Sequence, residues 1–499
     1  MSVFTFSPSR EDFIRDANAG KAQVIFTKRV SDLETPVSAM LKLPDDAPAF
    51  LLESVEGGES RGRYSIIGID PDLMWRCYGN RSEISTTPPF AESSFESAWD
   101  DSMSTLRRLV HEHRMDLPEG TPPMAAGLIG YMGYDMVKLM ERLPDTKPDP
   151  LKIPDACFIR PRVQLIFDGV DGVVYILAPV WKTESDAGKI YDTTCARLEK
   201  IARQLQGPLD QRNYYKDVPA IPRAFRSNMR EDEHAAMIKK AKEYMAAGDI
   251  FQVVLGQRFT ADFDLPPLAL YRALRHMNPS PFLFYLNFGD YALVGSSPEI
   301  LVRLRDDTVT IRPIAGTRKR GKTKAEDAAL AADLLADPKE LAEHLMLLDL
   351  GRNDVGRVAK AGDVRVTERM TIEHYSHVMH IVSNVEGTID PKYDAVDALI
   401  AGFPAGTVSG APKIRAMEII DELEPVKRSY YGGCVGYFSA NGTMDTCITL
   451  RTALVKGGKI HVQAGGGIVA DSVAADEYQE SLNKAKAVMR AAEEAVKFA

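Results

Sequence analysis

The strand-like segments of this 499-residue chain do not alternate regularly with helices, and this order constrains the fold more than any other feature. Short apolar or alternating runs bounded by turn residues occupy 49–54, 64–68, 163–167, 173–177, 251–254, 282–287, 292–294, 435–438, 447–453 and 459–463. A doubly wound parallel sheet would need a helix after almost every strand. The order of elements therefore predicts an α+β fold.

A change in composition near the middle of the chain predicts a domain boundary. The chain is too long for one ordinary hydrophobic core, so two domains are expected. A helix ending near Leu205 is followed by Gly207-Pro208 and a polar, proline-bearing stretch. A second helix then runs from Arg230 to Ala247, with Gly248 as its C-terminal cap. We place the domains at 1–222 and 223–499, and expect a last helix from about Asp476 to Phe498.

The charge and cysteine content exclude several classes of protein. A net charge of −9 argues against broad nucleic-acid binding. No apolar run approaches the roughly 20 residues that span a bilayer, and the N-terminus lacks the pattern of a secretory signal. The five cysteines are scattered and have no metal-ligand spacing. We expect a cytoplasmic protein that binds neither nucleic acid nor membrane.

One segment matches the sequence motif of a phosphate-binding loop. Residues 316–323 read Gly-Thr-Arg-Lys-Arg-Gly-Lys-Thr, which fits G-x-x-x-x-G-K-[ST]. A phosphate cradle uses backbone amides in a tight turn, which the bulky, charged residues Thr317 to Arg320 do not favour. The apolar run at 345–349 also reads as helix, not as the strand such a fold requires. An NTPase is therefore the weaker interpretation.

Two pairs of glutamates could bind a divalent cation. Glu340 and Glu343 are three residues apart in one predicted helix, and Glu477 and Glu480 repeat the spacing in another. Residues three apart share a helix face, so the two pairs could form an oxygen-rich site suited to Mg²⁺. The spacing alone equally describes two solvated helix faces.

Three further segments could contact an anion or a ring. Gly465 to Gly467 follow the predicted strand 459–463, and Arg451 lies on the neighbouring predicted strand; a tight turn explains the glycines equally well. A dinucleotide site is excluded because too little chain follows for a second strand. The run 403–413 leads into a helix and could bind an anion or be a plain loop. His374, His377 and His380 precede a predicted strand, where hydrogen bonding is expected more than metal binding.

Taken together, these runs resemble the large subunit of anthranilate synthase, a chorismate-utilising enzyme. The resemblance covers most of the chain and rests on the motifs at 51–54, 278–282, 296–299, 313–318, 343–354, 403–413, 431–437, 463–467 and 480–485. It implies two large antiparallel β-sheets packed face to face with helices on the outside. It also implies an N-terminal regulatory domain that binds tryptophan and a C-terminal catalytic domain that binds chorismate.

The resemblance assigns roles to individual residues. It implies that Glu299 is the general acid for the departing C4 hydroxyl and that His380 is the catalytic histidine facing the ring. Thr407 is implied as a third catalytic residue that contacts the substrate. Substrate contacts are implied for Gly316, Thr317, Tyr431, Arg451, Gly465, Gly466 and Gly467. Mg²⁺ ligands are implied at Glu343 and Glu480, with Glu340 and Glu477 acting through water.

Two positions separate the implied reaction from those of related enzymes. Aminodeoxychorismate synthases carry a nucleophilic lysine where this chain has Ala315, and isochorismate-forming relatives carry a lysine where it has Gln252. The chain shows no glutaminase segment. We therefore expect a separate glutamine amidotransferase subunit, and hence a hetero-oligomer.

The resemblance also implies feedback inhibition by L-tryptophan. The matching residues are Ser54 from the first half and Pro281, Phe282 and Leu283 from the second. An ordinary strand end is the alternative interpretation of Ser54. A regulatory subunit without catalysis is the alternative for the chain, although Glu299, Glu343, His380 and Glu480 are all present.

Overall fold

The computed structural model describes residues 4–44, 48–54, 62–181, 186–209, 219–375 and 378–499. Its strands form two antiparallel sheets that share two long strands, β3 (Tyr64–Tyr78) and β7 (Ala156–Asp168). These strands pair along their length, with a register shift between Pro71 and Leu73. One half of the pair belongs to each sheet, because β2 and β8 flank one half while β4 and β6 flank the other.

The first sheet continues from β3 towards the C-terminal half of the chain. Its strands, in order of pairing, are β1 (Gln23–Val30), β8 (Val173–Val180), β7, β3, β2 (Ala49–Glu53), β11 (Phe282–Asn287), β12 (Tyr291–Ser297), β21 (Thr452–Lys456), β22 (Lys459–Ile468) and β10 (Gln252–Asp262). The short strands β9 (Arg226–Ser227) and β18 (Gly410–Ala411) pair with β10.

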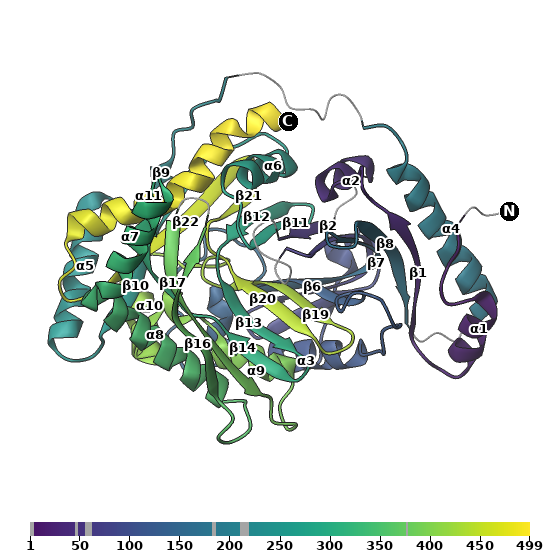
Figure 1. Cartoon of the computed structure of the whole chain (residues 1–499), viewed down its shortest axis with the longest axis horizontal. Helices are drawn as coiled ribbons and strands as arrows, with labels where there is room; N and C mark the ends of the chain where they lie inside the picture. Colours follow the sequence, from purple (N-terminus) through teal and green to yellow (C-terminus); the bar gives the residue numbers. More distant parts are fainter. Residues whose placement is uncertain (1–3, 45–47, 55–61, 182–185, 210–218, 376–377) are drawn as a thin grey trace.

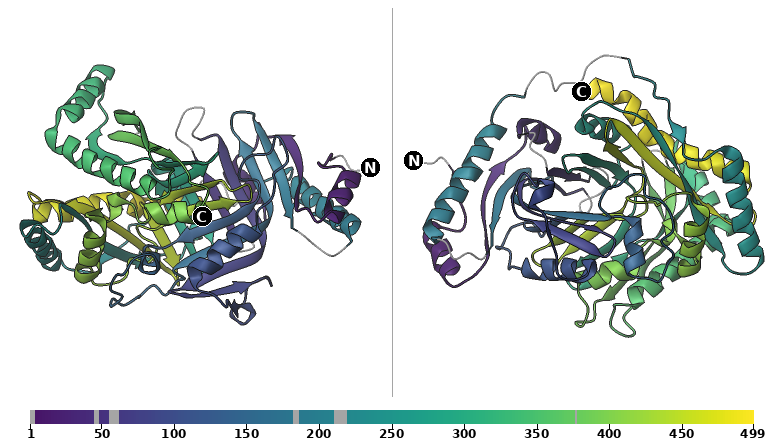
Figure 2. Two further views of the ribbon diagram at one scale, coloured as in Figure 1. Left: turned by 90° about the horizontal axis from the view of Figure 1, so that it is seen from below. Right: turned by 180° about the vertical axis from the view of Figure 1, so that it is seen from behind.

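The second sheet continues from β7. Its order is β5 (Glu96–Ser97), β4 (Arg81–Ser85), β3, β7, β6 (Gly127–Met132), β19 (Cys434–Ser439), β20 (Met444–Ile448), β13 (Ile300–Arg305), β14 (Thr308–Ile311), β17 (Val378–Thr388) and β16 (Arg365–His374), with β15 (Ile314–Lys319) also paired to β17. In both views of Figure 2 the N-terminal strands and the C-terminal strands lie side by side.

The hydrophobic core separates into layers that match the two faces of each sheet. In β11, Leu283 and Tyr285 join a cluster with α1, α2, α4, α6 and α11, whereas Phe284 and Leu286 join a cluster shared with strands of the second sheet. This alternation is the two-residue period of a strand buried on both faces. A further cluster joins the second sheet to α3, α8, α9 and α10. The predicted α+β fold, with two antiparallel sheets face to face and helices outside, is confirmed.

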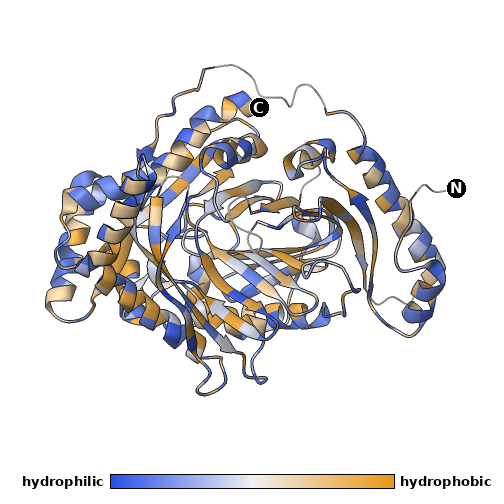
Figure 3. Ribbon diagram, in the orientation of Figure 1, coloured by the Kyte–Doolittle hydropathy of each residue, from blue (hydrophilic) through white to orange (hydrophobic). Residues whose placement is uncertain are grey.

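The helices lie on the outside of the sheets, as Figure 1 shows, and polar and apolar residues are interspersed along them in Figure 3. They are α1 (Arg10–Asn18), α2 (Pro36–Lys42), α3 (Ser102–Glu112), α4 (Ala187–Leu205), α5 (Glu231–Ala246), α6 (Pro267–Met277), α7 (Lys324–Ala336), α8 (Pro338–Gly356), α9 (Ala395–Gly402), α10 (Lys413–Leu423) and α11 (Ala474–Glu494). Short 3₁₀ turns are η1 (Glu92–Ser94), η2 (Tyr134–Leu139), η4 (Gly406–Val408) and η5 (Ala495–Phe498). None of the helices in the described ranges is long and apolar enough to cross a membrane.

Most predicted elements are present, although several strands, among them β3, β7 and β10, are longer than predicted. The predicted strand 447–453 is wrong, because β20 ends at Ile448 and β21 begins at Thr452. Arg451 lies between them with a φ of 47°, a conformation that no strand adopts. The strand predicted to end at Gln463 continues through the glycines to Ile468.

The strands on either side of residue 222 pair directly with one another. β2 pairs with β11, and β6 pairs with β19, so both predicted domains contribute to both sheets. Part of the predicted linker, 210–218, lies outside the described residues. The boundary at residue 222 stays a prediction.

Candidate active site

The candidate site lies where the end of the first sheet meets α8 and the end of the second sheet. Gln252 begins β10 in the first sheet, and its amide Nε2 donates a 3.0 Å hydrogen bond to Glu343 of α8. Helix α8 packs on β15 and β17 of the second sheet. The run 403–413 joins the two parts, since it forms η4 and then β18, where Ala411 pairs with Gln252. It is mostly buried and is not a plain surface loop.

Glu299 and Thr407 form a buried acid with one hydroxyl partner. Glu299 follows β12, and its side chain is 6% exposed. The hydroxyl of Thr407 donates to the carboxylate, with 3.1 Å to each oxygen. Burial raises the pKa of Glu299 to about 8, while the Thr407 hydroxyl and the backbone amide of Ile314 oppose the rise. The carboxyl is therefore protonated at neutral pH and can give a proton.

His380 lies on β17 opposite Thr317 of β15. Its Nδ1 is 3.0 Å from the backbone oxygen of Gly316 and 3.0 Å from the Thr317 hydroxyl. A carbonyl oxygen can only accept, so Nδ1 carries the hydrogen and Nε2 remains an acceptor. Burial, and then the positive charge of Arg451, lower the pKa of His380, which keeps the imidazole neutral.

Gly316 lies at a bulge that aims Thr317 at His380. The register between β15 and β17 shifts between Ala315 and Thr317, and Gly316 has a φ of 73°. Such a bulge favours glycine because it needs the left-handed backbone region. A Cβ at Gly316 would lie 3.1 Å from a carboxylate oxygen of Glu340, so this turn of backbone borders α8.

The predicted glutamates are near one another in part: Glu343 feels the charges of Glu340 and Glu480, and Glu477 feels the charge of Glu480. The N-cap residue Asp337 accepts hydrogen bonds from the amides of Lys339 and Glu340, which starts α8. Glu340 accepts a 3.2 Å bond from Arg318. Burial raises the pKa of Glu343, and the nearby charges of Glu340 and Glu480 raise it further.

The second pair, on α11, lies over the glycine strand. A Cβ at Gly466 would come within 3.0 Å of Glu477 Oε2 and 3.7 Å of Glu480 Oε1. Burial raises the pKa of Glu477, and its Oε2 is buried without a hydrogen-bond partner. Lys484 supplies positive charge 2.7 Å from Glu480.

Whether these carboxylates suit a metal can be judged from their donors. As the side chains stand, the described part of the chain holds no group of three His, Cys, Asp or Glu residues placed to bind a metal ion. The donor set is nevertheless chemically suited to Mg²⁺, since it offers only hard oxygens, one of them buried and unpaired. His374 lies on β16, and His377 is outside the described residues.

Gly465 to Gly467 lie inside β22, opposite Gly256, Leu255 and Val254 of β10. β21 stops pairing with β22 at Val462, so it does not cover this edge of the glycine segment. Burial raises the pKa of Tyr431 to about 12, while the nearby backbone amide of Gly465 opposes the rise. The alternative interpretation of the glycines as a tight turn is therefore wrong, because they lie within a strand near Tyr431.

The segment 316–323, which matches the sequence motif of a phosphate-binding loop, does not form such a loop. Residues 316–319 belong to β15. The amide of Gly321 donates to Asp327 and that of Lys322 to Glu326, at 2.8 Å each. Both carboxylates come from the start of α7, so they occupy the place a phosphate would take. Residues 345–349 are helical, as predicted.

The residues predicted to bind L-tryptophan lie at one end of the β2–β11 pair. Ser54 directly follows β2, Phe282 begins β11, and Leu283 is opposite Glu53. Sequence reasoning missed Glu53, which is 5% exposed and bound by the hydroxyl of Tyr271 and by Arg275 at 2.8 Å. Residues 55–61 lie outside the described residues.

Known proteins resemble the chain over nearly its full length. The family model described as chorismate binding enzyme matches residues 47–490. The chain is 56% identical to anthranilate synthase component 1 from Cereibacter sphaeroides, with 98% of both chains covered. It is 47% identical to the protein of that name from Pseudomonas aeruginosa, covering 97% of this chain and 98% of the relative.

Solved structures of known proteins have the same fold as this chain. Anthranilate synthase component I from Streptococcus pneumoniae superposes with a TM-score of 0.78 at 35% identity, covering 92% of this chain and 99% of that one. The menaquinone-specific isochorismate synthase from Escherichia coli shares the fold with a TM-score of 0.69 at 19% identity, covering 97% and 98%. From its sequence and its fold, the chain belongs to the chorismate binding enzyme family.

Proposed function

We propose that this chain is the large subunit of an anthranilate synthase, which converts chorismate and ammonia to anthranilate and pyruvate as the first step of tryptophan biosynthesis. The observation that carries the proposal is Glu299, a protonated, buried acid held by Thr407 near the amide of Ile314, on the strand β15 whose Thr317 is bonded to the neutral His380. The two relatives named above bear the name anthranilate synthase component 1.

The proposed chemistry has two stages. Ammonia adds at C2 of the ring while the double bonds shift, and the C4 hydroxyl leaves as water with the proton of Glu299. The ammonium group formed at C2 loses one proton, which balances the proton given by Glu299. The C2 proton is then lost, the bond from C3 to the enolpyruvyl oxygen breaks, and the departing enol takes up a proton to become pyruvate. His380 would present Nε2 to the ring, and Gly316 and Thr317 would bound the substrate.

The proposed binding groups are those that the resemblance implies. Tyr431, Arg451 and the amides of Gly465 to Gly467 would hold the enolpyruvyl carboxylate. Glu343 and Glu480, with Glu340 and Glu477 through water, would hold Mg²⁺. When bound, the ion would neutralise and orient the ring carboxylate of chorismate.

The choice of nucleophile rests on two side chains that cannot be activated. Ala315 has no nucleophile, and Gln252 has no base, where related enzymes carry lysine. Gln252 is instead engaged with Glu343. Ammonia would thus meet neither a covalent lysine intermediate nor a lysine-activated water.

We further propose that ammonia comes from glutamine through a separate amidotransferase subunit. The isolated chain, given chorismate and Mg²⁺, should produce anthranilate fluorescence with an ammonium salt, and more at higher pH where more ammonia is unprotonated. Glutamine should give none until the partner is added. Glutamine-dependent synthesis by the chain alone would refute the need for a partner.

The Ser54 end of β2 is proposed as an inhibitory site for L-tryptophan. Ser54 and Pro281-Phe282 come from opposite sides of residue 222, so a ligand bridging them could favour one arrangement of the two halves. Ser54→Phe, which fills this space, should leave synthesis intact and abolish inhibition. Ser54→Ala should raise the half-inhibitory concentration by roughly 2- to 13-fold, the effect of one lost hydrogen bond. Unchanged dose–response curves in both variants would make Ser54 an ordinary strand end.

A further inference from the structure

Arg428 is a buried arginine that touches several parts of the site without entering it. It lies between α10 and β19, and its side chain is 2% exposed. Its Nε and Nη2 form hydrogen bonds of 3.0 and 2.6 Å to the carboxylate of Glu424, which is 4% exposed. A buried ion pair is weak evidence for stability, because desolvation offsets most of the attraction. The role of the Arg428–Glu424 pair therefore depends on which groups it holds in place.

The remaining donors of Arg428 bind the backbone of two site segments. Nη1 donates to the carbonyl of Val408 at 2.6 Å, directly after Thr407. Nη2 donates to the carbonyl of Val254 at 2.7 Å, two residues after Gln252. Glu424 also accepts the amide of Gly256 at 2.8 Å, opposite Gly465. One ion pair thus fixes the Thr407 turn and the strand that faces the glycines.

The ring of Tyr431 lies beside the same guanidinium. Its centroid is 5.6 Å from the Arg428 carbon, and the ring of Tyr134 is at 4.6 Å on η2. Tyr431 lies near the backbone amide of Gly465, so Arg428 also borders the proposed carboxylate site.

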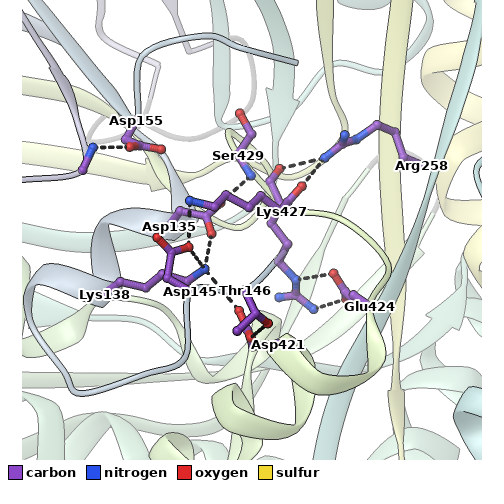
Figure 4. A network of polar contacts seen from close by, with 12 residues as sticks. Asp135, Lys138, Asp145, Thr146, Asp155, Arg258, Asp421, Glu424, Lys427 and Ser429 are labelled. Atoms are coloured by element: carbon purple, nitrogen blue, oxygen red, sulfur yellow. Dashed lines mark hydrogen bonds and ion pairs between the residues drawn. The ribbon is translucent and has the colours of Figure 1, made fainter. Parts of the chain in front are cut away.

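The segment that carries Arg428 is itself anchored by a polar network, shown in Figure 4. Arg258 donates to the carbonyl of Lys427 at 2.5 Å. Asp135, from the N-terminal half, accepts the amide of Ser429 at 2.8 Å. The backbone on both sides of Arg428 is therefore held in place, and this fixes the point from which its guanidinium group extends.

We propose that Arg428, paired with Glu424, is a positioning residue that holds Thr407 against Glu299. It touches no reacting atom. The role rests on the proposed function, because it acts through the acid assigned to Glu299. Lysine cannot replace it, since a single ammonium cannot reproduce the planar fork that reaches Glu424, Val408 and Val254 together.

The test compares pH profiles of Arg428→Lys, Thr407→Val and the double variant, with the rate of anthranilate formation expressed per unprotonated ammonia. Activity that needs protonated Glu299 falls as pH rises through its pKa. The hydrogen bond from Thr407 favours the ionised form of Glu299, so its loss raises the pKa of Glu299 further. The alkaline limb of the pH–rate profile, the range in which activity falls as pH rises, therefore moves to higher pH. The charged side chains that share the cavity with Glu299 are Arg312 and Asp354, and all variants retain them.

Arg428→Lys should lower kcat by about 10- to 100-fold, the cost of a small misplacement, and shift the limb in the same direction as Thr407→Val. The double variant should shift it no further than Thr407→Val alone. Glu424→Asp, which keeps both charges but shortens the pair, should show the same shift and replaces Arg428→Lys if that variant does not fold. Arg76→Lys is the matched control, a buried arginine bound to Glu83 and Glu92, and should leave the limb unchanged.

A lower kcat with an unmoved limb, or a shift in the double variant that is the sum of the two, would show that Arg428 only supports the fold. A wild-type chain that forms no anthranilate rejects the proposed function before any variant is made. The two failures are therefore distinct.

Discussion

Glu299→Gln is expected to lower kcat by about 10²- to 10⁴-fold, the usual contribution of a general acid. The amide keeps the shape of the side chain and can still accept from Thr407, but it has no proton to give. In the wild type, activity per unprotonated ammonia should fall above about pH 8, because burial raises the pKa of Glu299 to about 8. In the variant this decline should disappear from the residual rate.

Stability provides the control for this variant. The folded pKa of Glu299 lies above its unfolded value, so the unfolded chain binds fewer protons between the two values, and stability falls as pH rises through that window. Glutamine removes this cost, so Glu299→Gln should melt no lower than wild type at neutral pH. A variant that keeps more than about a tenth of wild-type kcat, a smaller loss than acid catalysis supplies, would remove Glu299 from the acid's role.

Glu343→Gln is expected to abolish turnover even at saturating ammonia. The substitution is nearly isosteric and its amide oxygen can still accept from Gln252, so the fold should be unchanged. What is lost is an anionic oxygen near the charges of Glu340 and Glu480. Mg²⁺ prefers such charged, hard ligands, so the ion should bind more weakly.

Binding of Mn²⁺ to the free chain, followed by electron paramagnetic resonance, gives a readout independent of turnover. Glu343→Gln should weaken it, whereas Glu231→Gln, an exposed glutamate at the start of α5, should not. Near-normal kcat with an unchanged magnesium requirement and unchanged Mn²⁺ binding would take Glu343 out of the site.

The regular parts of the fold could be predicted because their patterns are local. β11 matches its predicted bounds, Phe282–Asn287, since its apolar side chains fill both faces of a buried strand. Helix α5 lies within a residue of its prediction, and Gly248 after it has a φ of 83°. These signals depend only on neighbouring residues.

The errors arise where tertiary contacts override local preference. Glycines are poor strand formers, yet Gly465 lies within β22. The strand needs glycine at this position because a Cβ there would lie 2.6 Å from the carbonyl oxygen of Leu255. Arg451 interrupts a run that reads as one strand, since its backbone is left-handed.

The ion pairs of the interior also escaped sequence reasoning. The sequence analysis did not single out Glu424 and Arg428, although their spacing of four residues was a usable signal. Glu53 and Arg275 are far apart in sequence, and only the pairing of β2 with β11 brings them together.

The central claim is that the chain adds ammonia, and not water or a lysine, at C2 of chorismate. Wild-type protein incubated with chorismate, Mg²⁺ and ¹⁵N-labelled ammonium, followed by mass spectrometry of the products, tests it most directly. We predict ¹⁵N-labelled anthranilate and an equal amount of pyruvate as the only products. Isochorismate, salicylate or an aminodeoxychorismate that retains its enolpyruvyl group as the main product would contradict the claim.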